Sequence, residues 1–130
     1  MLIGLLNHFT LKCRVEDLEP LKTFYGSVLG LTEGPRPGFD FPGAWLYSGG
    51  QATVHLAARL DEAAAPATGP LDHISFNGQD IEAMRKRLAD LGIAFGESPV
   101  PGFPLHQIFL KDPVGLKVEI TYRTDEETAL

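Results

Sequence analysis

The sequence predicts an α+β fold made of two copies of one module, each running from a strand through a helix to further strands. The first observation is an internal repeat, because residues 6–11 (LNHFTL) match residues 71–76 (LDHISF), with His8 aligned to His73. Both stretches alternate apolar and polar residues, as β-strands do. Each is followed by apolar residues at helical spacing. Two such modules side by side give a curved, mixed and mainly antiparallel sheet with helices on its outer face.

Length and composition are those of one ordinary globular domain, residues 1–130. The net charge of −6 gives the chain no electrostatic reason to bind nucleic acid or an anionic membrane. Cys13 has no internal disulfide partner, and we expect it to be a small buried hydrophobic residue. The apolar start is too short for a signal-peptide core, and no stretch has the length of a membrane span. These features predict a cytoplasmic protein with a small-molecule or protein partner.

The first module spans about residues 5–59. Asp17 is predicted to cap its helix, which Gly30 would end in a left-handed conformation. Pro20 falls in the first turn of this helix, where its missing N–H costs little. Residues 46–50 (LYSGG) then lie between two strand-like runs and predict a hairpin.

The second module spans about residues 69–123 and repeats this order. Asp80 is the predicted helix cap and Gly92 the residue that ends the helix. Residues 110–115 (LKDPVG) predict the equivalent hairpin. The rest of the chain is predicted to be a linker and a polar tail, residues 60–68 and 124–130.

The alternation also predicts which side chains share a face. Three histidines and one carboxylate fall on the polar faces of four strands: His8, His55, His73 and Glu119. A single strand histidine is usually a hydrogen-bonded core or surface residue, and a single strand glutamate usually faces solvent. At repeat-related positions, however, the four residues are brought to one concave surface. Imidazole and carboxylate without thiolate suit one divalent ion, with Zn, Ni, Co, Mn and Fe(II) all open.

Other side chains are candidates for binding a substrate. Trp45, Gln107 and Phe109 fall on the same side as the four polar residues. Arg36 could hold a substrate carboxylate, or could be a solvated loop residue. His106 falls on the opposite face from Gln107, and we expect it to be a surface residue. Three further aromatic residues lie in loops that could cover the site, or could serve core or dimer packing: Phe39, Phe41 and Phe103.

Four segments carry a resemblance to a known family: LNHFTLKCRVEDLEPLKTFYGSVLGL, GAWLYSGGQATVHLA, LDHISFNGQDIEAMRKRLADLGI and IFLKDPVGLKVEITY. They resemble the vicinal oxygen chelate superfamily, which includes glyoxalase I, methylmalonyl-CoA epimerase, type I extradiol dioxygenases and bleomycin-resistance proteins. The resemblance implies paired βαβββ modules around a metal cavity. It also implies metal ligands at His8, His73 and Glu119, with His55 at the fourth position of the family's site.

The fourth position separates activities within that superfamily. Glyoxalase I and the epimerase hold Glu or Gln there, and in glyoxalase I the carboxylate is both ligand and proton shuttle. Extradiol dioxygenases hold a histidine that acts as acid/base, which His55 resembles. However, those dioxygenases also place a tyrosine ten residues before the metal-binding glutamate, where this chain has Phe109. His55 therefore stays open as a ligand or as a catalytic acid/base, with Glu119 as its catalytic partner.

Three functions remain open at this point. The first is a metal-dependent enzyme, a glyoxalase I-like lyase or isomerase acting on a small substrate chelated through vicinal oxygens. The second is a type I extradiol ring-cleavage dioxygenase. The third is a non-catalytic, ligand-sequestering protein of the bleomycin-resistance kind. The resemblance also implies a homodimer, with each cavity formed by one chain or by two.

Overall fold

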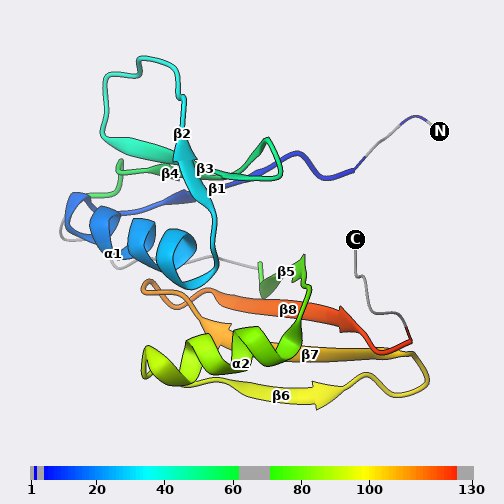
Figure 1. Ribbon diagram of the computed structural model, residues 1–130. Coiled ribbons are helices and arrows are strands. Elements are labelled where there is room, and N and C mark those ends of the chain that lie inside the picture. The colour runs from blue at the N-terminus through cyan, green and yellow to red at the C-terminus, as the bar shows by residue number, and fades with distance from the viewer. Residues whose placement is uncertain (1, 3–4, 62–70, 126–130) are drawn as a thin grey trace. The chain divides into compact units, whose positions relative to one another are not determined.

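The computed structural model describes residues 2, 5–61 and 71–125. The chain divides into two compact units, residues 1–67 and 68–130, each with one four-stranded sheet and one helical segment (Figure 1). The predicted α+β fold with paired modules is confirmed. Two predicted segments lie largely outside the described residues, the 60–68 linker and the 124–130 tail.

The sheet of unit 1 has the strand order β1-β4-β3-β2. Its strands are β1 (Phe9–Lys12), β2 (Thr32–Gly34), β3 (Gly43–Ser48) and β4 (Gln51–Ala57). β1 runs parallel to β4 and the other pairs are antiparallel, because a helical crossover separates β1 from the rest while a two-residue turn joins β3 to β4. Val54 and Leu56 are fully buried on one face, while His55 between them is half-buried on the other.

The sheet of unit 2 repeats this arrangement in the order β5-β8-β7-β6. Its strands are β5 (His73–Asn77), β6 (Gly96–Pro99), β7 (Leu105–Lys111) and β8 (Lys117–Arg123). β5 is parallel to β8, and the remaining pairs are antiparallel. The parallel strand pairs of the two units have matching registers around the candidate ligands. Thr10 pairs with His55 in unit 1, and Ser75 pairs with Glu119 in unit 2.

The helical segment of unit 1 is irregular. It comprises a 3-10 turn η1 (Val15–Asp17), helix α1 (Leu18–Thr23) and a π-helical turn η2 (Phe24–Val28). The predicted cap at Asp17 is wrong, because its carboxylate accepts from the backbone N–H of Arg14 (3.2 Å) and from the guanidinium of Arg14 (3.0 Å). The helical segment therefore begins with η1, three residues before α1. Gly30 ends it with a φ of 88°, as expected.

The helix of unit 2, α2 (Ile81–Asp90), is regular and follows the prediction. The Asp80 carboxylate accepts from the backbone N–H of Ala83 at 3.1 Å, which caps the first turn. Gly92 follows the helix with a φ of 68°. Leu88 is fully buried on the side of α2 that faces the core of this unit. Within the described residues, no helix combines the length and apolar character needed to cross a membrane.

Candidate metal-ligand pairs

In unit 1, the side chains of His8 and His55 lie against each other. Their ring centroids are 3.8 Å apart and their planes are inclined by 10°, so the two rings are stacked. Trp45 pairs with His55 across β3 and β4 and stacks on it at 3.9 Å, which places His55 between two flat rings. We refer to His8 and His55 as the stacked pair.

The surroundings of His55 favour its neutral form. Its Nε2 lies 3.0 Å from the carbonyl oxygen of Ala52 and donates a hydrogen bond to it when it carries the proton. Burial lowers the pKa of His55 and the nearby charge of His8 lowers it further, while the hydrogen bond to Ala52 acts in the opposite direction. With the proton on Nε2, the lone pair is on Nδ1, the nitrogen left to bind a metal or accept a proton.

The stacked pair does not converge on one point. An imidazole binds a metal ion in its own ring plane, and two nearly parallel planes do not meet at one ion. One ring must turn before His8 and His55 can bind the same ion. His8 is oriented by a hydrogen bond from its Nδ1 to Asn7 Oδ1 (2.8 Å), which leaves its Nε2 lone pair available.

In unit 2, His73 faces Glu119, and we refer to these residues as the imidazole–carboxylate pair. His73 Nε2 lies 3.5 Å from Glu119 Oε1. Two ligands bound to one tetrahedral ion at ordinary bond lengths are about 3.4 Å apart. His73 Nδ1 donates to Asp72 Oδ2 at 2.7 Å, so its Nε2 carries the lone pair. The pair therefore fits a divalent ion with little movement.

Polar neighbours hold the Glu119 carboxylate in place. Glu119 is 8% exposed, and Gln107 Nε2 donates to its Oε2 at 3.2 Å. The same Gln107 nitrogen is 3.2 Å from the hydroxyl of Thr121, which also bonds to Ser75 at 2.7 Å. Phe109 lies directly opposite Glu119 in the β7–β8 register. Gln107 thus orients the carboxylate, a role that the sequence analysis did not assign to it.

Two further residues were missed by the sequence analysis. Asn7 and Asp72 occupy the same place in the two repeats, immediately before His8 and His73, and each accepts from the adjacent imidazole. The hydrogen bond from His73 lowers the pKa of Asp72, and Lys117, 3.3 Å away, lowers it further. The repeated polar residue before each histidine was the sequence signal that could have identified them.

Arg36 is engaged by its own loop. Its Nη2 donates to the carbonyl of Phe41 at 2.7 Å, and its guanidinium lies 5.0 Å from the ring centre of Phe39. Phe39 also stacks on Phe41 (5.0 Å) and approaches Trp45 (6.5 Å). Binding of a substrate carboxylate by Arg36 stays a prediction, as does the covering of a cavity by the loop aromatics.

His106 lies apart from both pairs. It pairs in register with Tyr122 on the face opposite Gln107, and its Nε2 is 2.8 Å from Glu97 Oε1. It is half-buried rather than fully on the surface. Glu97 is also bonded by Arg85, and the two partners, Arg85 first, lower the pKa of Glu97 to about 2. His106 thus belongs to an ion-pair cluster beside α2.

Each unit supplies two of the four predicted ligands. Among residues 2, 5–61 and 71–125, no three histidine, cysteine or acidic side chains converge closely enough to hold a metal ion. Of the two pairs, the imidazole–carboxylate pair has the separation suited to a shared ion. The complete set of four, and its binding of one divalent ion, stays a prediction.

A family model of the glyoxalase/bleomycin resistance protein/dioxygenase superfamily matches residues 5–120. The chain belongs to this superfamily. The match extends over both units, so the repeated strand–helix–strands order is the paired module of the superfamily. A comparison with curated proteins found no significant match.

Several solved structures are similar to this chain over nearly its whole length. A glyoxalase family protein from Bacillus anthracis is 22% identical, with a TM-score of 0.76, covering 95% of this chain and 98% of that one. Lactoylglutathione lyase from Agrobacterium tumefaciens is 21% identical, with a TM-score of 0.69 and coverages of 94% and 96%. TnmS3, an antibiotic binding protein from Streptomyces sp. CB03234, is 22% identical, with a TM-score of 0.69 and coverages of 95% and 98%. A lyase and a binding protein share this fold, so the fold alone does not select the activity.

Proposed function

We propose that this superfamily member is a metal-dependent lyase or isomerase of the glyoxalase I type, acting on a small substrate that binds through two neighbouring oxygens. The observation that carries the proposal is the imidazole–carboxylate pair, with His73 Nε2 3.5 Å from Glu119 Oε1. Glu119 is buried, and a buried carboxylate needs a cation or several donors to compensate its desolvation. Gln107 donates to only one of its oxygens, which leaves Oε1 for a metal ion.

Three side chains would hold the ion in this proposal: His8, His73 and Glu119. The ion could be Zn, Ni, Co, Mn or Fe(II), and when bound it would polarise the chelated oxygens and stabilise negative charge on the substrate. Asn7 and Asp72 would keep the two Nε2 lone pairs directed outward by accepting from Nδ1. The site would form within one chain or between two copies in a homodimer.

His55 is the proposed proton carrier. Burial favours the neutral form of His55. Its Nε2 donates a hydrogen bond to the carbonyl of Ala52, so Nδ1 is the nitrogen that can accept a proton. A neutral imidazole can act as a general base, so Nδ1 could take a proton from a substrate carbon and return it to an oxygen of the same substrate. Stacking on Trp45 would hold the ring plane during the transfer. If the ring turns away from His8, His55 could instead be a fourth ligand.

The test combines metal binding with turnover. Protein stripped with a chelator is titrated with Ni, Zn and Co, and then assayed with the adduct of methylglyoxal and glutathione. We expect one ion per chain and turnover with at least one metal, both lost in H73A and in E119Q. H106A is the matched control, because His106 lies outside both pairs. Absence of metal binding by the wild-type protein would overturn the proposal.

A ligand-sequestering protein is the second candidate, favoured by the aromatic series Phe41, Phe39 and Trp45 beside the stacked pair. TnmS3, which is similar in fold, is an antibiotic binding protein. In that case elemental analysis shows no metal, and H73A keeps the stability and the ligand affinity of the wild type. Oxygen uptake with catechols and Fe(II) in the same assay series would point to the dioxygenase activity instead.

A further inference from the structure

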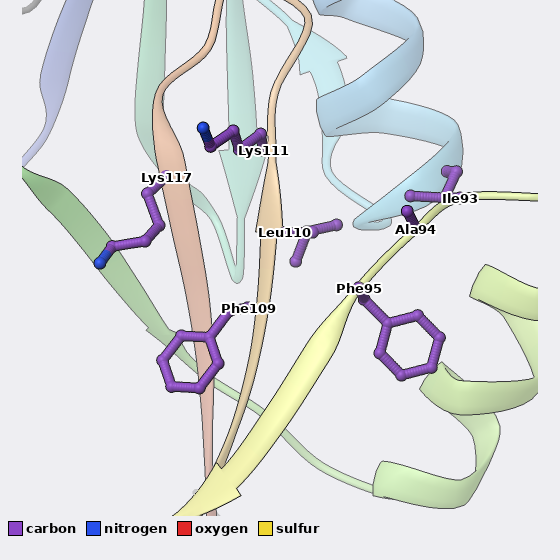
Figure 2. A pocket seen from close by; sticks show the side chains of 7 residues that line it. All are labelled: Ile93, Ala94, Phe95, Phe109, Leu110, Lys111 and Lys117. Atoms are coloured by element: carbon purple, nitrogen blue, oxygen red, sulfur yellow. The ribbon is translucent and has the colours of Figure 1, made fainter.

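Unit 2 contains a pocket beside the end of β7. It has a volume of about 520 Å³ and is lined by Ile93, Ala94, Phe95, Phe109, Leu110, Lys111 and Lys117 (Figure 2). The pocket opens where residues 93–95, which precede β6, run beside the end of β7. This size lies within the usual range for small-molecule sites. Its lining is apolar except for two lysines and contains no acidic residue.

The two lysines form an unfavourable pair. Lys111 and Lys117 are directly opposite each other across β7 and β8, and like charges in that position repel. Lys117 is compensated by Asp72, whose Oδ2 is 3.3 Å from its Nζ. In the part of the chain that the structure describes, no acidic side chain pairs with Lys111. About one positive charge is thus left at the pocket of a chain whose net charge is −6.

The pocket adjoins the imidazole–carboxylate pair. Lys117 and Glu119 are two residues apart on one face of β8, so their Cα atoms are separated by about 7 Å. Phe109 lines the pocket and lies opposite Glu119. Figure 2 shows the side chains of Phe109, Lys111 and Lys117 on one side of the strands. A ligand in the pocket can therefore reach Glu119 with atoms several bonds from its charged end.

We propose that this pocket selects substrates with an apolar body and one carboxylate, the carboxylate binding to Lys111 and Lys117. The single uncompensated charge fits a monoanion. Beside the lysines, the Phe109 side chain fits a hydrocarbon chain or ring. This inference rests on the proposed function for its link to catalysis. It makes the substrate a hydrophobic organic acid whose vicinal oxygens lie several bonds from the carboxylate.

The test uses metal-free full-length protein and two probes that differ only in charge, 4-phenylbutyrate and 4-phenylbutyramide. We expect isothermal titration calorimetry to show the acid binding roughly tenfold more tightly than the amide. The reason is that a hydrogen bond from a lysine to a carboxylate is stronger than one to a neutral amide. High salt should reduce this difference. Equal affinities for acid and amide, or no binding of either, would overturn the inference. This test uses only the wild-type protein, so it does not depend on the folding of any variant.

Variants assign the effect to residues. K111Q should weaken binding of the acid several-fold and leave binding of the amide unchanged, whereas F109A should weaken both. K86Q is the matched control, because Lys86 lies on α2 of the same unit and pairs with Asp90. An equal loss in K86Q and K111Q would contradict the assignment. Since the metal is removed, failure of the proposed function leaves this result unchanged, and the metal titration of the wild-type protein tests that function separately.

Discussion

The two units share a topology but present their candidate ligands in different ways. Thr10 pairs with His55 and Ser75 pairs with Glu119, so the second partner of each pair occupies the same place in its sheet. In unit 1 that place holds an imidazole, and two imidazole rings stack. In unit 2 it holds a carboxylate, whose Oε1 lies 3.5 Å from the Nε2 edge of the imidazole. One exchange of side chain type therefore accompanies the change from a ring stack to an imidazole–carboxylate pair.

The residues that contact His55 and Glu119 from the neighbouring strands also differ between the two units. The residue opposite His55 is Trp45, which covers its ring, and the residue opposite Glu119 is Phe109, which leaves the carboxylate to Gln107. A flat aromatic surface favours stacking, while an amide donor favours a fixed carboxylate. This difference supports the proposal that His73 and Glu119 bind a metal ion while His55 carries a proton.

The largest expected effect separates the two pairs by metal affinity. H73A should weaken zinc binding by more than 100-fold, because a ligand with a suitable separation is lost. H55A should weaken zinc binding by no more than about tenfold, because the stacked ring of His55 is not oriented to bind the same ion. Competition with a chromophoric chelator measures both, and H106A is the control. Equal losses in H73A and H55A would show that the stack opens to coordinate.

The second comparison concerns the hairpin turns. Asp112 is buried and accepts from the backbone N–H groups of Val114 and Leu116, both at 2.9 Å. D112A should therefore lower the free energy of unfolding by about 2 kcal/mol. S48A, at the exposed turn between β3 and β4, should change it by less than about 0.5 kcal/mol. Urea unfolding measures both values, and a D112A protein as stable as S48A would refute the role of this carboxylate.

A smaller effect is expected from the residues that orient the histidines. D72A should weaken zinc binding about tenfold, because His73 loses the acceptor that directs its lone pair. N7A should weaken it by about threefold, because a neutral amide is a weaker acceptor than a carboxylate. D90A, at another exposed aspartate of unit 2, is the control for lost charge. An unchanged affinity in D72A would leave the hydrogen bond without a function.

The smallest effect concerns acid stability. The pKa of Glu97 is lowered to about 2 by Arg85 and then His106, from an ordinary value of 4.5. The unfolded chain thus binds more protons between these values, so this contribution to stability is present above pH 4.5 and is lost as the pH falls towards 2. E97Q should flatten the fall of the urea midpoint over this window, modestly because the groups are exposed. D90N controls for the change in net charge, and a fall as steep in E97Q as in the wild type would exclude this source.

The repeat and the alternation of residue types were enough to predict the paired modules and the faces of the strands. The caps at Asp80, Gly30 and Gly92 also followed from local rules. The prediction for Asp17 was wrong because the helical segment begins three residues earlier, so its carboxylate accepts from the backbone N–H and the guanidinium of Arg14 instead of capping α1. The orienting role of Gln107 was missed because it depends on a neighbour in another strand.

By itself, the sequence determined the backbone plan and the side of each sheet on which His55, His73 and Glu119 lie, because side chains alternate along any strand. His8 precedes β1. Only the tertiary structure decided which ring atoms face which partners. Those directions depend on contacts from other strands and on hydrogen bonds to the adjacent Asn7 and Asp72. A pattern of apolar and polar positions does not reveal such contacts. The four residues therefore form one stacked pair and one imidazole–carboxylate pair.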